Sequence, residues 1–345
     1  MSMQALTRTA KTEKRYKERF GQLWRRATAE LKRSIGVVDL VRRFLVWSQD
    51  LRPNSVRQYR AAITFGLDQL AKNEPHLRVE VVEALRLLDS SRQHETVSTP
   101  ARKTKSVAPL RTSSSKAKAV SDRDFDRIIA AAPFYRSQYT DDLVASMRAN
   151  ILPGLRPIEW HGTKITIAGD TLIMIVPNGK NTNERAHGET RTLIFEEIDP
   201  LSRRYLIEWN ERVNAMTFEA YETLLTRIEE RMRVITRRLF PRRKFHPTPY
   251  SIRHAVSARL KQHYMGTAKT RDERDLGAAI VAALMGHAAD DTASHHYGNA
   301  SGKGGRGYPI PNADPEEVAR IRPKLAASRR KMHTMVYARR PIAAP

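Results

Sequence analysis

The chain has 345 residues, 40% of them hydrophobic, and a formal net charge of +24 from 61 lysines and arginines against 37 aspartates and glutamates. It has no cysteine, which excludes a disulfide framework, a thiolate zinc site and a cysteine nucleophile. No apolar run approaches the roughly 20 residues that span a bilayer, and the N-terminal stretch has no apolar segment typical of a signal peptide, so we expect a cytoplasmic protein.

The first part of the chain predicts a compact helical unit. Apolar residues recur at helical spacing over residues 11–33, and the segment VVDLVRRFLVWSQDL repeats that spacing. A third helix follows RPNS, where Asn54 or Ser55 can cap its start, and a fourth fits VEVVEALRLLDSS. We therefore expect a helical domain over residues 1–91, with polar faces rich in arginine and lysine.

The composition changes after this domain. Residues 92–120 are rich in Ser, Thr, Pro and Lys and almost free of bulky apolar side chains, which predicts a flexible basic linker. Beyond it, Ser121 with Asp124 three residues later suits a helix start. Helices are then expected at 121–132 and 139–151.

The spacing of apolar residues next changes from the helical period to the alternation that is typical of short strands. TKITIAG, TLIMIVPN and TRTLIF predict three strands, the first two joined by a turn at Gly169-Asp170. The pattern from residue 201 is helical again, with helices expected at 201–214, 217–239, 249–264, 273–285, near 289–297 and at 315–332, the last interrupted by Pro323. The fold class that we expect is mainly α with a small antiparallel β-sheet in a second domain, 121–312, followed by a C-terminal tail, 313–345.

Four segments of the second domain carry side chains that suit phosphoryl transfer without a metal. They are GLRPIEW with Arg156, VPNGKNTNER with Lys180, PYSIRHAVSARL with Arg253, and LMGHAADDTASHHYG with His287 and Tyr297. Guanidinium groups match the charged oxygens of a phosphodiester under attack with paired donors. A tyrosine hydroxyl can attack the phosphorus, a lysine can protonate the leaving sugar oxygen, and a histidine can orient the phosphate or shuttle a proton.

In their order, these segments resemble the tyrosine recombinase (phage-type integrase) family. The family pattern GLR-x-x-E, GK, H-x-L-R-H and LLGH followed by a tyrosine is matched by Gly154-Leu155-Arg156 with Glu159, Gly179-Lys180, Ile252-Arg253-His254, Leu284-Met285-Gly286-His287 and Tyr297. The resemblance covers most of 121–300 and extends more weakly to LRPNSVRQYRAAITF, which is similar to the family's helical core-binding domain. It implies a SAM-like core-binding domain at 1–91 and a catalytic domain at 121–312 that together form a two-domain clamp on double-stranded DNA.

The resemblance also implies a mechanism. Tyr297 attacks the scissile phosphate and forms a 3′-phosphotyrosine, which the hydroxyl of another strand later resolves, so that neither ATP, metal nor any other cofactor is required. The implied catalytic set is Arg156, Lys180, Tyr250, Arg253, His287 and Tyr297, with Glu159 and His254 as supporting residues. Four protomers act on two DNA sites through a Holliday junction, with a partner recombinase or directionality factor as a further candidate. The expected role is that of an integrase of a bacterial or phage mobile element.

The sequence departs from the family pattern at three places. Tyr250 stands where the family has its first histidine, and a phenol is a poorer acid–base group near neutral pH, so we expect it to act as a phosphate ligand. The interval from His287 to Tyr297 is one position longer than usual, which predicts a rearranged turn. The segment QHYMGTAKTRDERDLGAA is longer than the usual connector, which predicts an extra loop before the helix that leads to His287.

Other interpretations stay open. His295 and His296 beside Tyr297 raise the question of a metal site, but adjacent residues of a helix point about 100° apart and no acidic cluster accompanies them, so we expect no metal. Within the class, a type IB topoisomerase-like enzyme or a telomere resolvase is an alternative. From another class, the chain could be an inactive DNA-binding accessory or regulatory protein. The tail at 313–345 either folds back on its own domain or docks on an adjacent protomer.

Overall fold

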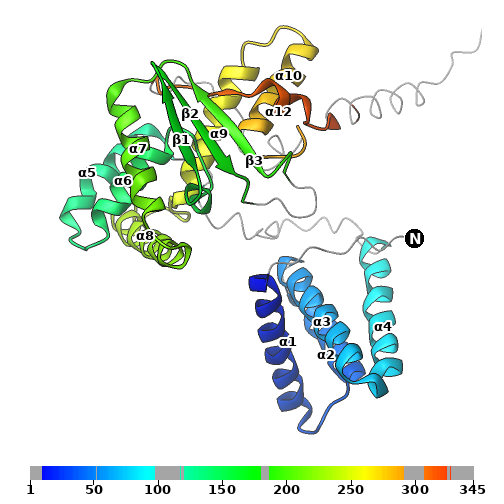
Figure 1. Ribbon diagram of the computed structural model, residues 1–345. Helices are drawn as coiled ribbons and strands as arrows, with labels where there is room; N and C mark the ends of the chain where they lie inside the picture. The colour runs from blue at the N-terminus through cyan, green and yellow to red at the C-terminus, as the bar shows by residue number, and fades with distance from the viewer. Residues whose placement is uncertain are drawn as a thin grey trace, which may run out of the picture. The chain divides into compact units, whose positions relative to one another are not determined.

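The computed structural model describes residues 10–51, 53–97, 117, 120–179, 186–290, 307–324 and 327 (Figure 1). The chain divides into two compact units, Met1–Ser115 and Lys116–Pro345, each with a buried hydrophobic core of its own. No helix within the described ranges is both long and apolar enough to cross a membrane.

The first unit is built from helices, as the periodicity predicts. Its elements are α1 (Ala10–Leu31), α2 (Val37–Ser48), α3 (Pro53–Asn73), the 3₁₀ turn η1 (Pro75–Leu77) and α4 (Arg78–Val97). The buried face of α2 repeats every three or four residues, through Val37, Leu40, Val41, Phe44 and Trp47, which is the stripe of an amphipathic helix.

Two boundaries in this unit differ from the prediction. α3 begins at Pro53, so that Asn54 and Ser55 lie inside its first turn, because proline needs no hydrogen-bond acceptor at the first helical position. α4 continues through Val97 into the range predicted as linker, because SSRQHET contains neither proline nor glycine to stop it. Of the rest of the predicted linker, only residues 117 and 120 are described.

The second unit is mainly helical with one small antiparallel sheet. Its elements before the sheet are α5 (Asp122–Ala131), η3 (Ala132–Phe134), α6 (Thr140–Asn150) and η4 (Pro157–Trp160), and those after it are α7 (Pro200–Asn214), α8 (Phe218–Leu239), α9 (Pro249–Met265) and α10 (Arg271–Leu284). The Ser121 side chain accepts a hydrogen bond from the Asp124 amide, 3.1 Å away, which confirms the predicted start of α5. α7 packs beside β1 and α10 beside β3, so helices flank the sheet at both ends (Figure 1).

The sheet has four strands in the order β1-β2-β3-β4, and all neighbours are antiparallel. The bounds are β1 (Lys164–Ala168), β2 (Thr171–Pro177), β3 (Thr190–Phe195) and β4 (Asn312–Ala313). The turn between β1 and β2 is at Gly169-Asp170, as predicted, with Gly169 at a φ of 60°. β4 has no counterpart in the prediction, because two residues carry too little alternation to signal a strand.

The segment after residue 306 belongs structurally to the second unit. β4 pairs with β3, and α12 (Pro315–Ala319) packs on α10. The helix predicted at 315–332, with an interruption at Pro323, is confirmed in part: α12 ends at Ala319, and residues 324 and 327, beyond Pro323, are helical again. The short helix predicted near 289–297 does not begin at Ala289, because this residue forms a parallel β-bridge with Arg322. Residues 291–297 lie outside the described residues.

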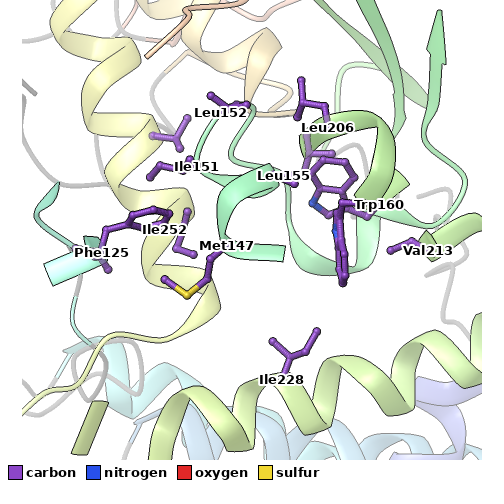
Figure 2. Close-up of a cluster of buried hydrophobic side chains, with 14 of the residues drawn as sticks. Phe125, Met147, Ile151, Leu152, Leu155, Trp160, Leu206, Val213, Ile228 and Ile252 are labelled. Atoms are coloured by element: carbon purple, nitrogen blue, oxygen red, sulfur yellow. The ribbon is translucent and has the colours of Figure 1, made fainter. Parts of the chain in front are cut away.

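The core of the second unit lies between the sheet and the helices. Figure 2 shows Leu155 and Trp160 among its buried side chains, together with Ile252 of α9. The indole nitrogen of Trp160 donates to the Asn150 side chain over 3.1 Å, and the Asn150 amide donates to the Leu155 carbonyl over 3.1 Å. Leu155 and Trp160 are therefore anchored in the core, which fixes the positions of Arg156 and Glu159 between them.

Candidate active site

The segment that carries Arg156 leaves α6 through a glycine that no other residue can replace without strain. Gly154 has a φ of 63°, and a Cβ atom there would lie 2.7 Å from the Cβ of Val256 on α9. Arg156 then adopts an extended backbone as the N-cap of η4, with Pro157 at the first position, as its place before proline predicts. Its side chain is 9% exposed.

Glu159 is the centre of the site. Its buried carboxylate accepts hydrogen bonds from the Arg156 amide at 2.8 Å, from the Arg156 guanidinium and from the Gly179 amide at 3.1 Å. It also pairs with Arg191 at 2.6 Å and with Arg253 at 3.8 Å. Burial alone would raise the pKa of Glu159, but the guanidinium groups of Arg191, Arg253 and Arg156 hold this pKa well below its ordinary value. The expectation that Glu159 supports an arginine is therefore matched by contacts to three of them.

Arg253 ties two other segments to this centre. It lies near the start of α9, where Thr248 is the N-cap, and its side chain is fully buried. Its guanidinium donates to the Gly154 carbonyl over 2.7 Å and to the Met285 carbonyl just after α10. The GLR segment and the end of α10 are thereby held against the same side chain.

His287 is placed by the way in which α10 ends. Gly286 has a φ of 64° and donates to the Ala283 carbonyl over 2.9 Å, while the His287 amide donates to the Ala282 carbonyl over 2.8 Å. These two bonds make a Schellman motif, which turns the chain sharply after the helix. A Cβ atom on Gly286 would lie 2.4 Å from the Oδ1 of Asn178, so this turn also packs closely on the β2–β3 hairpin.

The electrostatics of His287 follow from its surroundings. The residue is 4% exposed, and burial together with the charges of Arg253, Arg156 and Arg191 holds the pKa of His287 well below its ordinary value. Its ring is therefore neutral at neutral pH, so it can accept a proton or a hydrogen bond but has no proton to deliver as an imidazolium.

Arg191 is the site residue that the sequence prediction missed. It lies on β3 opposite Val176, and its side chain is fully buried against Glu159, Asn178 and the end of α10. A signal was present, because alternation along TRTLIF puts Arg191 on the same inward face as Leu193 and Phe195. A charged residue on an inward face indicates a buried ion pair.

Two of the predicted residues lie one turn apart on α9. The rings of Tyr250 and His254 meet edge to face, with centroids 5.4 Å apart and planes at 77°. Tyr250 precedes Arg253 by three positions on the same helix, so the two occupy neighbouring places on its surface. The structure thus gathers Arg156, Glu159, Arg253 and His287 at one place and puts Tyr250 and His254 on the helix that carries Arg253.

Lys180 and Tyr297 lie outside the described residues, as do His295 and His296. Among the residues that are described, no three His, Asp or Glu side chains form a group that could hold a metal ion.

The charge of the gathered side chains suits an anionic ligand. Three guanidinium groups, those of Arg156, Arg191 and Arg253, face one carboxylate, that of Glu159, which leaves two positive charges in excess. Buried charges without a counterion are costly. A phosphate group brought to this cluster would offset part of that excess, and arginine is the side chain that best matches its oxygens.

The structure is similar to two crystal structures of the XerH site-specific recombinase. One is its pre-cleavage complex with the difH substrate (14% sequence identity) and the other its post-cleavage complex with a palindromic difH substrate (13%). In both comparisons the TM-score is 0.45, and the match covers 81% of this chain and 73% of the recombinase chain. No protein-family model matches the chain, and no curated protein matches its sequence.

Proposed function

We propose that the chain is a site-specific DNA recombinase that cuts and rejoins double-stranded DNA through a 3′-phosphotyrosine intermediate. The observation that carries this proposal is the buried cluster in which the Glu159 carboxylate holds three arginines beside His287. Two of these arginines, and the histidine, stand at the motif positions of the family that the sequence resembles.

In the proposed reaction, the hydroxyl oxygen of Tyr297 attacks the scissile phosphorus. The bond from phosphorus to the sugar 5′ oxygen breaks, and that oxygen takes a proton from Lys180, which leaves a 3′-phosphotyrosine and a free 5′ hydroxyl. Arg156 and Arg253 stabilise the charge that develops on the phosphate oxygens. Attack by the 5′ hydroxyl of a second strand reverses these steps and regenerates the tyrosine.

The neutral ring of His287 and the phenol of Tyr250 complete the proposed set. A neutral imidazole can accept the proton that the attacking tyrosine loses, either directly or through water. Tyr250 donates a hydrogen bond to the phosphate, and His254 supports its ring through their edge-to-face contact. No metal or nucleotide cofactor takes part, because the phosphotyrosine conserves the energy of the broken bond.

The broader setting is proposed on the family resemblance alone. The unit at 1–91 binds DNA as a core-binding domain, and four copies act on two sites through a Holliday junction. The chain serves as the integrase of a mobile element, with a partner recombinase or a directionality factor where the reaction needs one.

One observation favours a second candidate. The Arg253 guanidinium has no exposed surface and donates to two backbone carbonyls, which is also what a purely structural arginine would do. A chain whose arginines serve the fold would be a DNA-binding accessory protein that does not cut.

The experiment that separates the candidates does not require a defined target sequence. Nicked duplexes with a randomised centre, from which the cleaved end can diffuse away, are incubated with the full chain and then denatured. The recombinase forms adducts that survive denaturation, and Tyr297→Phe forms none. Arg156→Lys lowers the rate of adduct formation on the order of 100-fold, because one paired donor to the developing charge is lost.

The outcomes distinguish the two candidates. Retention of particular duplexes without any adduct would favour the accessory protein and end the proposal of strand cleavage. Adducts that persist in Tyr297→Phe would show that another residue is the nucleophile. Absence of duplex binding even at low salt would reject both candidates.

A further inference from the structure

Arg191 makes polar contacts to three separate elements from inside the core. Its Nε donates to the Leu284 carbonyl over 2.9 Å, at the end of α10. Its Nη1 donates to the Asn178 side chain just after β2, and its Nη2 donates to Glu159 of η4, each over 2.6 Å. A single planar group thus fixes α10, the hairpin and η4 relative to β3.

Two of these acceptors, on Glu159 and Leu284, lie close to the proposed catalytic residues Arg156 and His287. The Glu159 oxygen that Arg191 binds also accepts the Arg156 amide, while its other oxygen holds the Arg156 guanidinium. The Leu284 carbonyl lies in the last turn of α10, three residues before His287. A carbonyl there has no partner within its helix, so a buried cation is a favourable one.

The fit around Arg191 is tight at the turn that carries His287. A Cβ atom on Gly286 would lie 2.9 Å from the Nη1 of Arg191 and 2.4 Å from the Oδ1 of Asn178. The turn after α10 therefore rests directly on the pair formed by Arg191 and Asn178. We expect displacement of that pair to move the turn, because the two side chains are the nearest atoms to Gly286 on that side.

Arg191 has no exposed surface, and its guanidinium is committed to protein acceptors. Because each of its three guanidinium nitrogens already donates to a protein acceptor, we assign it no contact with DNA. An apolar residue would be the ordinary choice at an inward strand position between a sheet and a helix. Burial of an ionised guanidinium is favourable only where every acceptor around it is well placed. Arg191 therefore requires the segments that carry its acceptors to keep one fixed arrangement.

We propose that Arg191 is a positioning residue of the DNA-cleaving site, and that its buried guanidinium fixes where Arg156 and His287 lie. This inference rests on the function proposed above. In this proposal Arg191 does not contact the reacting phosphate. It positions Arg156 through Glu159, and it positions His287 through the end of α10.

Substitutions at Arg191 separate geometry from charge. Arg191→Lys keeps a cation but cannot reach three acceptors in one plane, and Arg191→Met removes the charge as well. We expect either variant to lower the initial rate of adduct formation on the order of 100-fold at saturating DNA, the effect of a small misplacement of catalytic groups. Affinity for the duplex stays within about threefold, because the nitrogens of Arg191 are held by protein acceptors and none is left for a phosphate.

The pKa of His287, measured by NMR titration of the full chain, is a second readout that needs no cleavage. The charge of Arg191 contributes to the lowering of this pKa, so Arg191→Met raises it, and Arg191→Lys raises it less. Arg204→Met is the matched control, because Arg204 is exposed on α7, where it pairs with Glu208 and lies over the ring of Tyr205. We expect this control to leave both the rate and the pKa of His287 unchanged.

The outcomes that overturn the proposal are distinct from those that overturn the function. Wild-type adduct rates in both Arg191 variants reject positioning, and an equal loss of rate and duplex affinity points to a contact role instead. If neither variant folds, Asn178→Ala decides: it removes the acceptor of one Arg191 contact, and an unchanged rate rejects the proposal. If the wild type forms no adduct at all, the proposed function fails, and an unchanged pKa of His287 in Arg191→Met then rejects the inference separately.

Discussion

At the scale of single residues, the second unit uses one carboxylate to organise several cations. Glu159 is fully buried and has contacts to Arg156, Arg191 and Arg253, as well as to the Gly179 amide. Each arginine comes from a different element, so the carboxylate joins η4, β3 and α9. Removal of such a carboxylate lowers the stability of the fold more than removal of one partner of a surface ion pair, because it leaves buried cations without a counterion.

Replacement of this carboxylate tests that account. We expect Glu159→Gln to lower the free energy of unfolding by about 3–5 kcal/mol at pH 7, the cost of breaking a buried ion pair. Urea unfolding of the full chain, followed by circular dichroism, measures it. Glu230→Gln is the control, since Glu230 is half-exposed and pairs with an equally exposed Arg227, and it should cost less than about 1 kcal/mol. Equal losses in the two variants would contradict the central role of Glu159.

His287 gives a prediction about pH. Its pKa lies below the ordinary value in the folded chain, so the unfolded chain binds the proton more readily. Stability from the neutral ring is fully present above the ordinary pKa of about 6.5 and is lost as pH falls below it, at no more than about 1.4 kcal/mol per pH unit. The advantage of wild type over His287→Gln should therefore shrink between pH 7 and pH 5.

The measurement is urea unfolding of both proteins at a series of pH values. His76→Gln controls for the loss of a histidine, because His76 lies exposed in the first unit. A difference between wild type and His287→Gln that stays constant with pH would contradict a buried neutral ring.

At the scale of elements, two further groups of contacts add to the β3–β4 pairing in holding the segment at 307–324 to the second unit. On one side, Glu317 of α12 accepts from the amide and the hydroxyl of Thr192, both at 3.0 Å, and pairs with His187 at 3.3 Å. On the other, the Arg322 amide donates to the Ala288 carbonyl over 3.1 Å. The described part of the predicted tail thus folds back on its own unit, and docking on a neighbouring protomer stays a prediction for residues beyond it.

Adjacent glutamates of α12 provide a matched test of this attachment. Glu317→Ala leaves the partners on Thr192 and His187 unsatisfied, and we expect it to lower the free energy of unfolding by about 2–3 kcal/mol. Glu316→Ala removes an exposed side chain one position earlier and should change it by less than about 0.5 kcal/mol. Thermal unfolding of the two variants compares them directly. If both behave like wild type, Glu317 does not hold this segment.

At the scale of the whole molecule, the chain consists of two units with separate hydrophobic cores. The core of the first is formed by α1 to α4, and the core of the second lies between the sheet and α5 to α10. Each has enough buried apolar side chains to form a domain of ordinary size.

This separation predicts that the two units fold independently. Residues 1–115 and 116–345, expressed as separate chains, should each unfold in one cooperative transition, because neither core needs side chains of the other. Differential scanning calorimetry of the two fragments and the full chain measures this. A fragment without a cooperative transition would show that its core is incomplete.

Much of the fold follows from local signals in the sequence. The start of α5 was predicted well because its cap at Ser121 is explicit, and the predicted end of the helix at 273–285 lies close to the end of α10 at Leu284. The strands β1 to β3 were predicted because alternation and the Gly169-Asp170 turn are local features. β4 was not, since its pairing with β3 joins residues far apart in the chain and leaves no periodic trace.

The candidate site was predicted in part for the same reason. Arg156, Arg253 and His287 stand in segments with recognisable patterns, and the structure brings them together around Glu159. The role of Arg191 was missed because a basic residue near a hairpin is usually exposed, and only its inward register distinguishes it.

The turn at Gly286 has a consequence for sequence change in this chain. Most glycines with positive φ can be exchanged for asparagine at modest cost, because asparagine tolerates that backbone. Here the Cβ would also collide with the Asn178 and Arg191 side chains, which are themselves locked by their bonds. The position therefore admits a single amino acid, and a saturation library should return only glycine codons there among variants that keep wild-type stability.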